Sequence, residues 1–223
     1  MFPMQNLETT LAAALEALPT RKDRAGTIGS RLGISTAQTG LHTQRTRRRQ
    51  FVDGQGESNA AAIVKRLPRA GETLHFVMDG TSTLANAIPV IQAHIAEPTG
   101  LTICTLGLND QTTDMLVAML KAGTLTRLRL AMSSYFRASD PATAARAITM
   151  LTEAGAVVAV ERLHAKLQLW QPTTAQGRYV LTTSSNLRSC NCVQIGSITN
   201  DVGLYRWHNR WLSKFFKRNT IIK

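Results

Sequence analysis

Between Asn59 and Val160, short apolar runs alternate with amphipathic segments, and this alternation limits the possible folds more than any other feature. The apolar runs have the length of strands, and the segments between them carry apolar residues at helical spacing. The predicted strands are residues 74–78, 101–106, 126–132 and 157–160, and the predicted helices are residues 59–67, 82–96, 110–121 and 141–154. Such alternation predicts an α/β fold with a mixed, largely parallel sheet flanked by helices.

Residues 161–170 continue with a strict alternation of side chains. One face would carry His164, Lys166, Gln168 and Trp170, and the other Ala165, Leu167 and Leu169. This is the period of a strand with one buried face. A turn-rich link follows, and residues 179–181 form a second short strand that ends at a run of hydroxyl and amide side chains. We expect the two strands to pair and to bring a histidine, a lysine, a serine and an asparagine together.

These side chains suit the chemistry of a phosphodiester. A lysine supplies a point charge for a phosphate oxygen, while serine and asparagine supply hydrogen bonds. A histidine can act as a nucleophile or as a proton shuttle near neutral pH. The sequence therefore indicates candidate catalytic residues at His164, Lys166, Ser184 and Asn186, and candidate substrate-binding residues at Ser185 and Arg188.

The same residues resemble a known signature. His164-x-Lys166, followed by Thr183-Ser184-Ser185-Asn186, resembles the His-x-Lys…Gly-Ser-x-Asn motif of the phospholipase D superfamily. The resemblance is strongest over residues 158–191 and extends more loosely from about residue 74 to the C-terminus. It implies a phospholipase D-like fold over residues 57–223. It also implies metal-independent cleavage of a phosphodiester, without a cofactor, through a phosphohistidine on His164.

The chain carries one copy of this motif. Superfamily chains with one copy typically pair, so the resemblance implies a homodimer with one shared active site. Three departures from the family pattern weaken the implied activity. The family's aspartate five residues after the lysine is Gln171, and the glycine before the serine is Thr183. The family's glutamate that orients the catalytic histidine corresponds to Gln194. An amide at this position can hold the His164 ring but cannot stabilise its positive charge.

Two alternatives to a nuclease therefore stay open. The first is a nucleic-acid-binding protein that keeps the fold but has weakened or lost the chemistry. The second is a phospholipid hydrolase. This alternative is less favoured because the sequence shows no membrane-seeking apolar helix. A labelled-DNA assay and a choline-lipid assay would separate the three possibilities.

The charge balance favours a polyanionic partner, with DNA or RNA first. Lys and Arg number 26, against 14 Asp and Glu, which gives a net charge of +12. Residues 1–56 are predicted to form a separate N-terminal part, with a helix over residues 6–18 and a basic arm after it. Within this arm, residues 25–41 also have some features of a helix-turn-helix. Phosphate contacts are expected from Arg45, Arg47, Arg48 and Arg49.

The remaining features concern compartment and the C-terminal helix. Cys104 lies in an apolar run, and Cys190 and Cys192 are too close together for an ordinary zinc pair, so we expect a reducing, cytoplasmic setting. The start of the chain does not resemble a signal peptide, and no apolar run approaches the ~20 residues needed to span a bilayer, so no stable membrane association is expected. A last helix is predicted over residues 201–218. Its basic stripe, Arg206, Arg210, Lys214 and Lys217, is either a solvated face or a phosphate-binding ridge.

Overall fold

The computed structural model describes residues 48–54, 59–79, 83–174, 177–188 and 192–219. The elements predicted over residues 6–18 and 25–41, together with Arg45, Arg47 and Cys190, lie outside the described residues. In chain order the described elements are β1 (Arg48–Gly54), α3 (Ala60–Ile63), β2 (Glu72–Met78), α4 (Leu84–Ile95), β3 (Thr99–Thr105), α5 (Asp110–Lys121), β4 (Leu125–Ser133), α6 (Ser134–Ser139), α7 (Pro141–Glu153), β5 (Val157–Glu161), β6 (Leu167–Pro172), β7 (Tyr179–Thr183), β8 (Gln194–Asn200) and α8 (Val202–Asn219).

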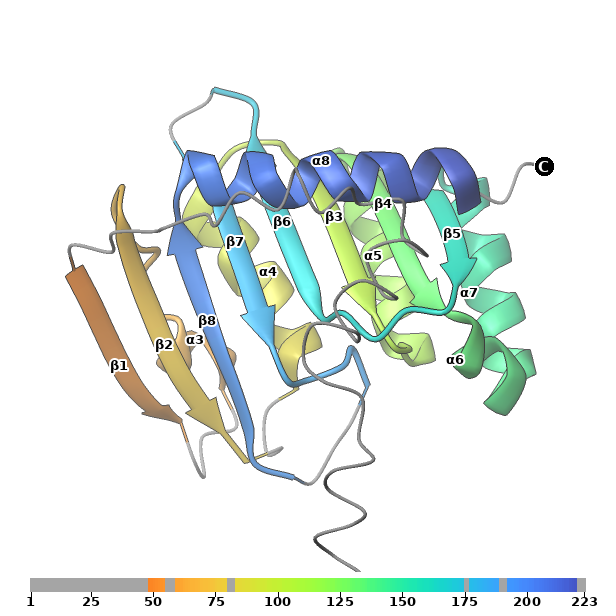
Figure 1. Cartoon of the computed structure of the whole chain (residues 1–223), viewed down its shortest axis with the longest axis horizontal. Coiled ribbons are helices and arrows are strands. Elements are labelled where there is room, and N and C mark those ends of the chain that lie inside the picture. Colours follow the sequence, from red (N-terminus) through yellow and green to blue (C-terminus); the bar gives the residue numbers. More distant parts are fainter. Residues whose placement is uncertain (1–47, 55–58, 80–82, 175–176, 189–191, 220–223) are drawn as a thin grey trace, which may run out of the picture. The chain divides into compact units, whose positions relative to one another are not determined.

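All the described strands join one mixed sheet, in the order β1-β2-β8-β7-β6-β3-β4-β5 (Figure 1). Parallel ladders join β1 to β2 at one edge and β3, β4 and β5 at the other. Antiparallel ladders join the strands between them. The predicted mixed α/β fold is confirmed. The centre of the sheet is antiparallel because β6, β7 and β8 follow one another through short links, and a parallel pair would need a crossover of a dozen or more residues.

Helices cover the two faces of this sheet differently. The helices α3 to α7 pack on one face over the larger hydrophobic core, which includes Ile88 and Leu116. On the other face, Leu212 and Phe216 of α8 pack against residues such as Leu169 of β6. Figure 1 shows α8 lying across the strands from β7 to β5. The strands β1 and β2 lie beyond the N-terminal end of α8, which does not cross them. One face of the sheet is therefore only partly covered.

The strand predicted over residues 161–170 begins later than expected, at Leu167. Residues 162–166 connect β5 to β6, and His164 is exposed in this connection. Both faces of β6 are buried, since Leu169 packs with α8 and Trp170 lies in the larger core. The prediction of a half-exposed strand was wrong because helices cover both sides of β6. The buried Gln168 accepts a hydrogen bond from Trp170 Nε1 at 3.2 Å through its side-chain oxygen.

Other differences lie near the N-terminal edge of the sheet. The helix predicted over residues 59–67 stops at Ile63. Beyond it, the guanidinium of Arg66 donates two hydrogen bonds, of 2.8 and 2.9 Å, to the Glu72 carboxylate and ties the connection to β2. The end of the predicted basic arm is also a strand: Arg48 and Arg49 begin β1, which pairs with β2. The elements β1, β8 and α6 were not predicted.

Candidate active site

The β6–β7 ladder brings the two parts of the His-x-Lys and Ser-x-Asn pattern to one end of the sheet. Leu167 opposes Thr182 in this ladder. Just beyond it, the backbone N–H of Thr183 donates to the carbonyl oxygen of Lys166 at 3.3 Å. His164 precedes Lys166 by two residues in the connection from β5. The backbone therefore holds Lys166 beside the start of the segment that carries Ser184 and Asn186.

Ser184 is fixed by the neighbouring strand β8. Its backbone N–H donates to the carbonyl oxygen of Ile195 at 2.9 Å, and the Ile195 N–H donates to Ser184 Oγ at 3.0 Å. The Ser184 hydroxyl in turn donates to Oε1 of Gln194 at 2.6 Å. Gln194 therefore contacts the motif through Ser184. In the part of the chain that the structure describes, no hydrogen bond joins Gln194 to His164.

Asn186 is directed towards the carboxyl end of β3. Its side-chain oxygen accepts a hydrogen bond from the backbone N–H of Leu106 at 3.1 Å. Ser185, which the sequence predicts to bind substrate, is buried instead, and its hydroxyl donates to the Asn186 carbonyl oxygen at 3.1 Å. The expected role of Ser185 is thereby corrected, because its hydroxyl is used within the loop. Ser184 is the serine of this pair that solvent reaches.

Lys166 and His164 differ in their surroundings. Partial burial lowers the pKa of the Lys166 ammonium group from its ordinary value. Among the described residues, no carboxylate forms a salt bridge with it. Within the same residues, the exposed His164 side chain makes no hydrogen bond. A lysine without a carboxylate partner among the described residues, two residues after an exposed histidine, can bind a phosphate group.

Gln171, Arg48 and Arg49 lie away from this point, whereas Arg188 follows Asn186 by two residues. Gln171 is near the far end of β6, roughly 16 Å along the strand from Lys166, and its Oε1 accepts hydrogen bonds from Arg127 at 3.2 Å and Tyr205 at 2.8 Å. The Arg188 guanidinium lies 5.9 Å from the centre of the Phe136 ring. Arg48 and Arg49 are exposed on β1, three strands from β7. Arg48 and Arg49 are therefore separated from the Ser184 segment by β2 and β8.

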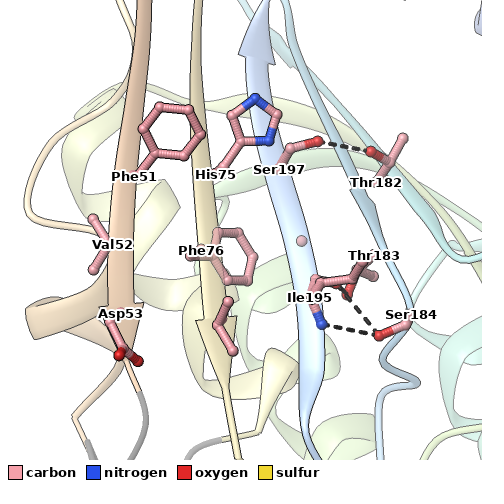
Figure 2. Close-up of a pocket in the computed structure, with 12 residues that line it drawn as sticks. Phe51, Val52, Asp53, His75, Phe76, Thr182, Thr183, Ser184, Ile195 and Ser197 are labelled. Carbon is pink, nitrogen blue, oxygen red and sulfur yellow. Dashed lines mark hydrogen bonds between the residues drawn. The ribbon is translucent and has the colours of Figure 1, made fainter.

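A groove that the sequence does not indicate lies next to Ser184. It has a volume of about 760 Å³ and crosses β1, β2, β8 and β7 on the face that α8 leaves uncovered. Figure 2 shows Phe51 and His75 at one end, and Ser184 and Ile195 at the other. Ser197 and Thr182 lie between them, with their hydroxyl oxygens 2.9 Å apart. Because four strands distant in sequence form it, no local pattern could have revealed this groove.

The described residues contain no group of three or more His, Cys, Asp or Glu side chains that could hold a metal ion. Asp53 is the acidic residue among those that line the groove. Within the same residues, no helix combines the length and apolar character that crossing a bilayer requires.

Comparisons with known proteins give similarities to solved structures alone, since no protein-family model and no curated protein matches the sequence. One similar structure is Nuc from Salmonella typhimurium, a phospholipase D family member, with 13% identity and a TM-score of 0.47, covering 68% of this chain and 98% of that one. Another is phosphatidylserine synthase from Haemophilus influenzae, with 16% identity and a TM-score of 0.46, covering 68% of this chain and 40% of that one.

A third similar structure is TrmBL2, an archaeal chromatin protein, with 9% identity and a TM-score of 0.43, covering 98% of this chain and 68% of that one. The first of these structures belongs to the family that the motif resembles. With TM-scores below 0.5, the three similarities carry no argument about function. The function has to be argued from the residues of the site.

Proposed function

We propose that this protein is a metal-independent phosphodiesterase that cleaves nucleic acid through a phosphohistidine intermediate. The observation that carries the proposal is the hydrogen bond from Thr183 N–H to the Lys166 carbonyl oxygen, which joins the two parts of the motif. It keeps a lysine and a serine at one end of the sheet, with an exposed histidine nearby in sequence. These are the groups that phosphoryl transfer to a side chain needs.

In the proposed reaction, Nε2 of His164 attacks the phosphorus, and the bond from phosphorus to the leaving oxygen breaks. The Lys166 ammonium and Nδ2 of Asn186 bind the non-bridging oxygens, on which negative charge increases in the transition state. Oδ1 of Asn186 accepts the hydrogen bond from Leu106, which fixes the direction in which Nδ2 points. A proton is supplied to the leaving oxygen, and a water molecule then hydrolyses the phosphohistidine.

The proton donor is the reason for proposing a homodimer. One imidazole cannot be the nucleophile and protonate the leaving group in the same step. A two-fold axis beside His164 would bring a second copy of this residue to the same phosphate, so that one histidine attacks and the other acts as acid and base. The exposure of His164 is compatible with such an arrangement.

Nucleic acid is the proposed substrate because of charge. The chain carries a net charge of +12, which favours a polyanion. Additional phosphate contacts are proposed for the basic stripe of α8, all of whose members are exposed: Arg206, Arg210, Lys214 and Lys217. We also assign Arg188, which is exposed two residues after Asn186, to substrate binding.

The decisive experiment measures cleavage of labelled single-stranded and duplex DNA and RNA, with and without a chelator. Cleavage by the wild type should resist the chelator, and His164→Ala should abolish it while leaving binding nearly intact. A denatured sample stopped during turnover should retain acid-labile phosphate on the wild type and none on His164→Ala. Cleavage that persists in His164→Ala would rule out the proposed nucleophile.

The binding-protein alternative is favoured by one specific observation. Gln171, where the family has an aspartate, accepts hydrogen bonds from the Arg127 guanidinium and the Tyr205 hydroxyl, so its amide already has partners within the fold. Gln194 is likewise bound to Ser184. A chain that has replaced both carboxylates can bind phosphates without turning over. Salt-sensitive DNA binding with no cleavage of any phosphodiester would favour this alternative.

A further inference from the structure

The helix α8 packs on one face of the sheet but leaves the part of that face formed by β1, β2 and β8 exposed. We call this area the open face and define it by Phe51, His75, Val77, Ile195 and Ser197. Phe51 is 76% exposed and Ile195 62% exposed, which is unusual for large apolar side chains on strands. In the register of the sheet, Phe51 opposes His75, which opposes Ser197. The open face is therefore one surface that leads across the strands to Thr182 and Ser184.

The two aromatic rings at its far end are already stacked. The Phe51 and His75 ring centroids are 5.4 Å apart, and their planes are inclined by 16°. Because Phe51 remains largely exposed, a further flat group can reach the side of its ring that His75 does not cover. Beyond the rings, the groove is lined by hydroxyl groups of Ser197, Thr182 and Ser184. It thus offers an aromatic platform at one end and hydrogen-bonding groups at the other (Figure 2).

The charges around the platform are arranged by the period of β1. Arg49 precedes Phe51 by two residues and lies on the same face of the strand, and both Arg48 and Arg49 are exposed. Asp53, two residues after Phe51, lines the groove on its other side and disfavours a phosphate there. A chain with phosphates near Arg49 and a flat, uncharged base over Phe51 fits this order.

We propose that the open face binds single-stranded nucleic acid, with one unpaired base stacked on Phe51 and the strand directed towards Ser184. In a duplex the bases are stacked on one another and cannot lie on the Phe51 ring. Stacking on an aromatic side chain is tolerant of sequence, since every base has a flat face. The direction of the strand towards Ser184 rests on the proposed function, which places cleavage at that end of the groove. The stacking of a base on Phe51 does not depend on cleavage.

Equilibrium binding of labelled single strands of about 12 nucleotides, of both DNA and RNA, tests the proposal. Phe51→Ala should weaken single-strand binding roughly 5- to 100-fold and leave duplex binding within about twofold. Phe51→Trp should bind single strands about as tightly as the wild type. Trp207→Ala is the matched control, because Trp207 is an exposed aromatic on α8 outside the groove. Phe51→Ala removes mainly exposed surface, whereas Trp207 is 43% exposed, so thermal unfolding of each variant checks that the fold is kept.

The binding and cleavage measurements distinguish the single-strand proposal from its alternatives. Equal single-strand affinity of Phe51→Ala and Trp207→Ala would overturn the proposal. So would a loss of duplex affinity in Phe51→Ala as large as its loss of single-strand affinity. A change from dimer to monomer in Phe51→Ala, without a loss selective for single strands, would identify the open face as a contact between copies. If the wild type cleaves nothing but binds single strands through Phe51, the enzyme proposal fails and this one stands. If the wild type cleaves nucleic acid and Phe51→Ala does not change single-strand binding, the enzyme proposal stands and the single-strand proposal fails.

Discussion

Ser184 Oγ and Gln194 Oε1 lie 2.6 Å apart, in a hydrogen bond that joins the end of β7 to the start of β8. Gln194→Glu would keep an acceptor for the Ser184 hydroxyl and add a negative charge next to this serine of the motif. We expect the turnover number to rise about tenfold or more, because a nearby carboxylate stabilises an imidazolium, and loss of such a partner can cost on the order of 10⁴ in a serine protease. Single-turnover cleavage of a labelled oligonucleotide measures the effect.

Gln171→Glu is the control for this substitution. It adds the same charge near the opposite end of β6, where Arg127 and Tyr205 already contact the side chain. It should leave the turnover number unchanged within about twofold, since exposed charges that far away are screened by salt. An equal increase in both variants would show that general charge, rather than a local effect near His164, is responsible.

Asn186 allows its structural and chemical roles to be separated. Asn186→Asp retains the acceptor for Leu106 N–H but loses the amide donors, so its stability should stay near that of the wild type. Its turnover should fall roughly 10²-fold or more, as when a donor to a developing negative charge is removed. Asn186→Ala should also lower the free energy of unfolding by about 1 kcal/mol, because Leu106 N–H loses its partner. Urea titrations and cleavage assays together measure both effects, and an active Asn186→Asp would exclude the amide from the phosphate site.

The shared site can be tested by mixing subunits. Wild type and His164→Ala are refolded together in known ratios, so that dimers form at random. If two copies of His164 serve one phosphate, activity should follow the square of the wild-type fraction, because mixed dimers are inactive. Independent sites would give a linear dependence. Sedimentation of the same samples should show dimers, and a strict monomer at micromolar concentration would contradict the shared site.

Acid should weaken the fold through Glu72. The backbone N–H of Arg69, followed by the Arg66 and Gln50 side chains, lowers the pKa of Glu72 from its usual value to about 2. Because the folded pKa is the lower one, the stabilisation is complete above the unfolded pKa, near 4.5, and is lost as the pH falls towards 2. Glu72→Gln should therefore reduce the pH dependence of the free energy of unfolding in this range, and should lower that free energy by roughly 1–3 kcal/mol at neutral pH.

Glu153→Gln on α7 is the comparison for Glu72, since Glu153 is exposed. It should change the urea midpoint little at any pH between about 2 and 7. If Glu72→Gln behaves as this control does, the hydrogen bonds to Glu72 do not contribute measurably to stability. The measurement needs no assumption about activity, so it tests the structure separately from the proposed function.

The sequence predicts best the elements that carry their own periodicity. The bounds predicted for α5, residues 110–121, agree with those in the structure. By contrast, β8 reads as glycine, hydroxyl and amide residues with few apolar ones, and it is a strand because β2 and β7 pair with it on both sides. Similarly, the charged residues of β1 indicate an arm until its pairing with β2 is known. Contacts between distant segments leave no local pattern to read.

The site shows the same division. The His-x-Lys and Ser-x-Asn spacing points to the residues around Lys166, and the Thr183–Lys166 hydrogen bond joins the two segments that carry them. The burial of Ser185 could not be read from its neighbours, because it depends on how the loop packs against the end of β3. The partner of Gln194 could not be foreseen either, since the contact with Ser184 depends on β8 lying next to β7.

The place of β8 also bears on how the chain folds during synthesis. β2 is hydrogen-bonded only to β1 and β8 among the described strands, so the pair near the beginning of the described chain joins the rest of the sheet through its last strand. While residues 194–200 are still inside the ribosome, β1 and β2 can form at most a two-stranded ribbon, which is marginal in water. Their unpaired edge is then open to other nascent chains. The β1–β2 pair therefore joins the rest of the sheet only after residues 194–200 have been synthesised and have left the ribosome.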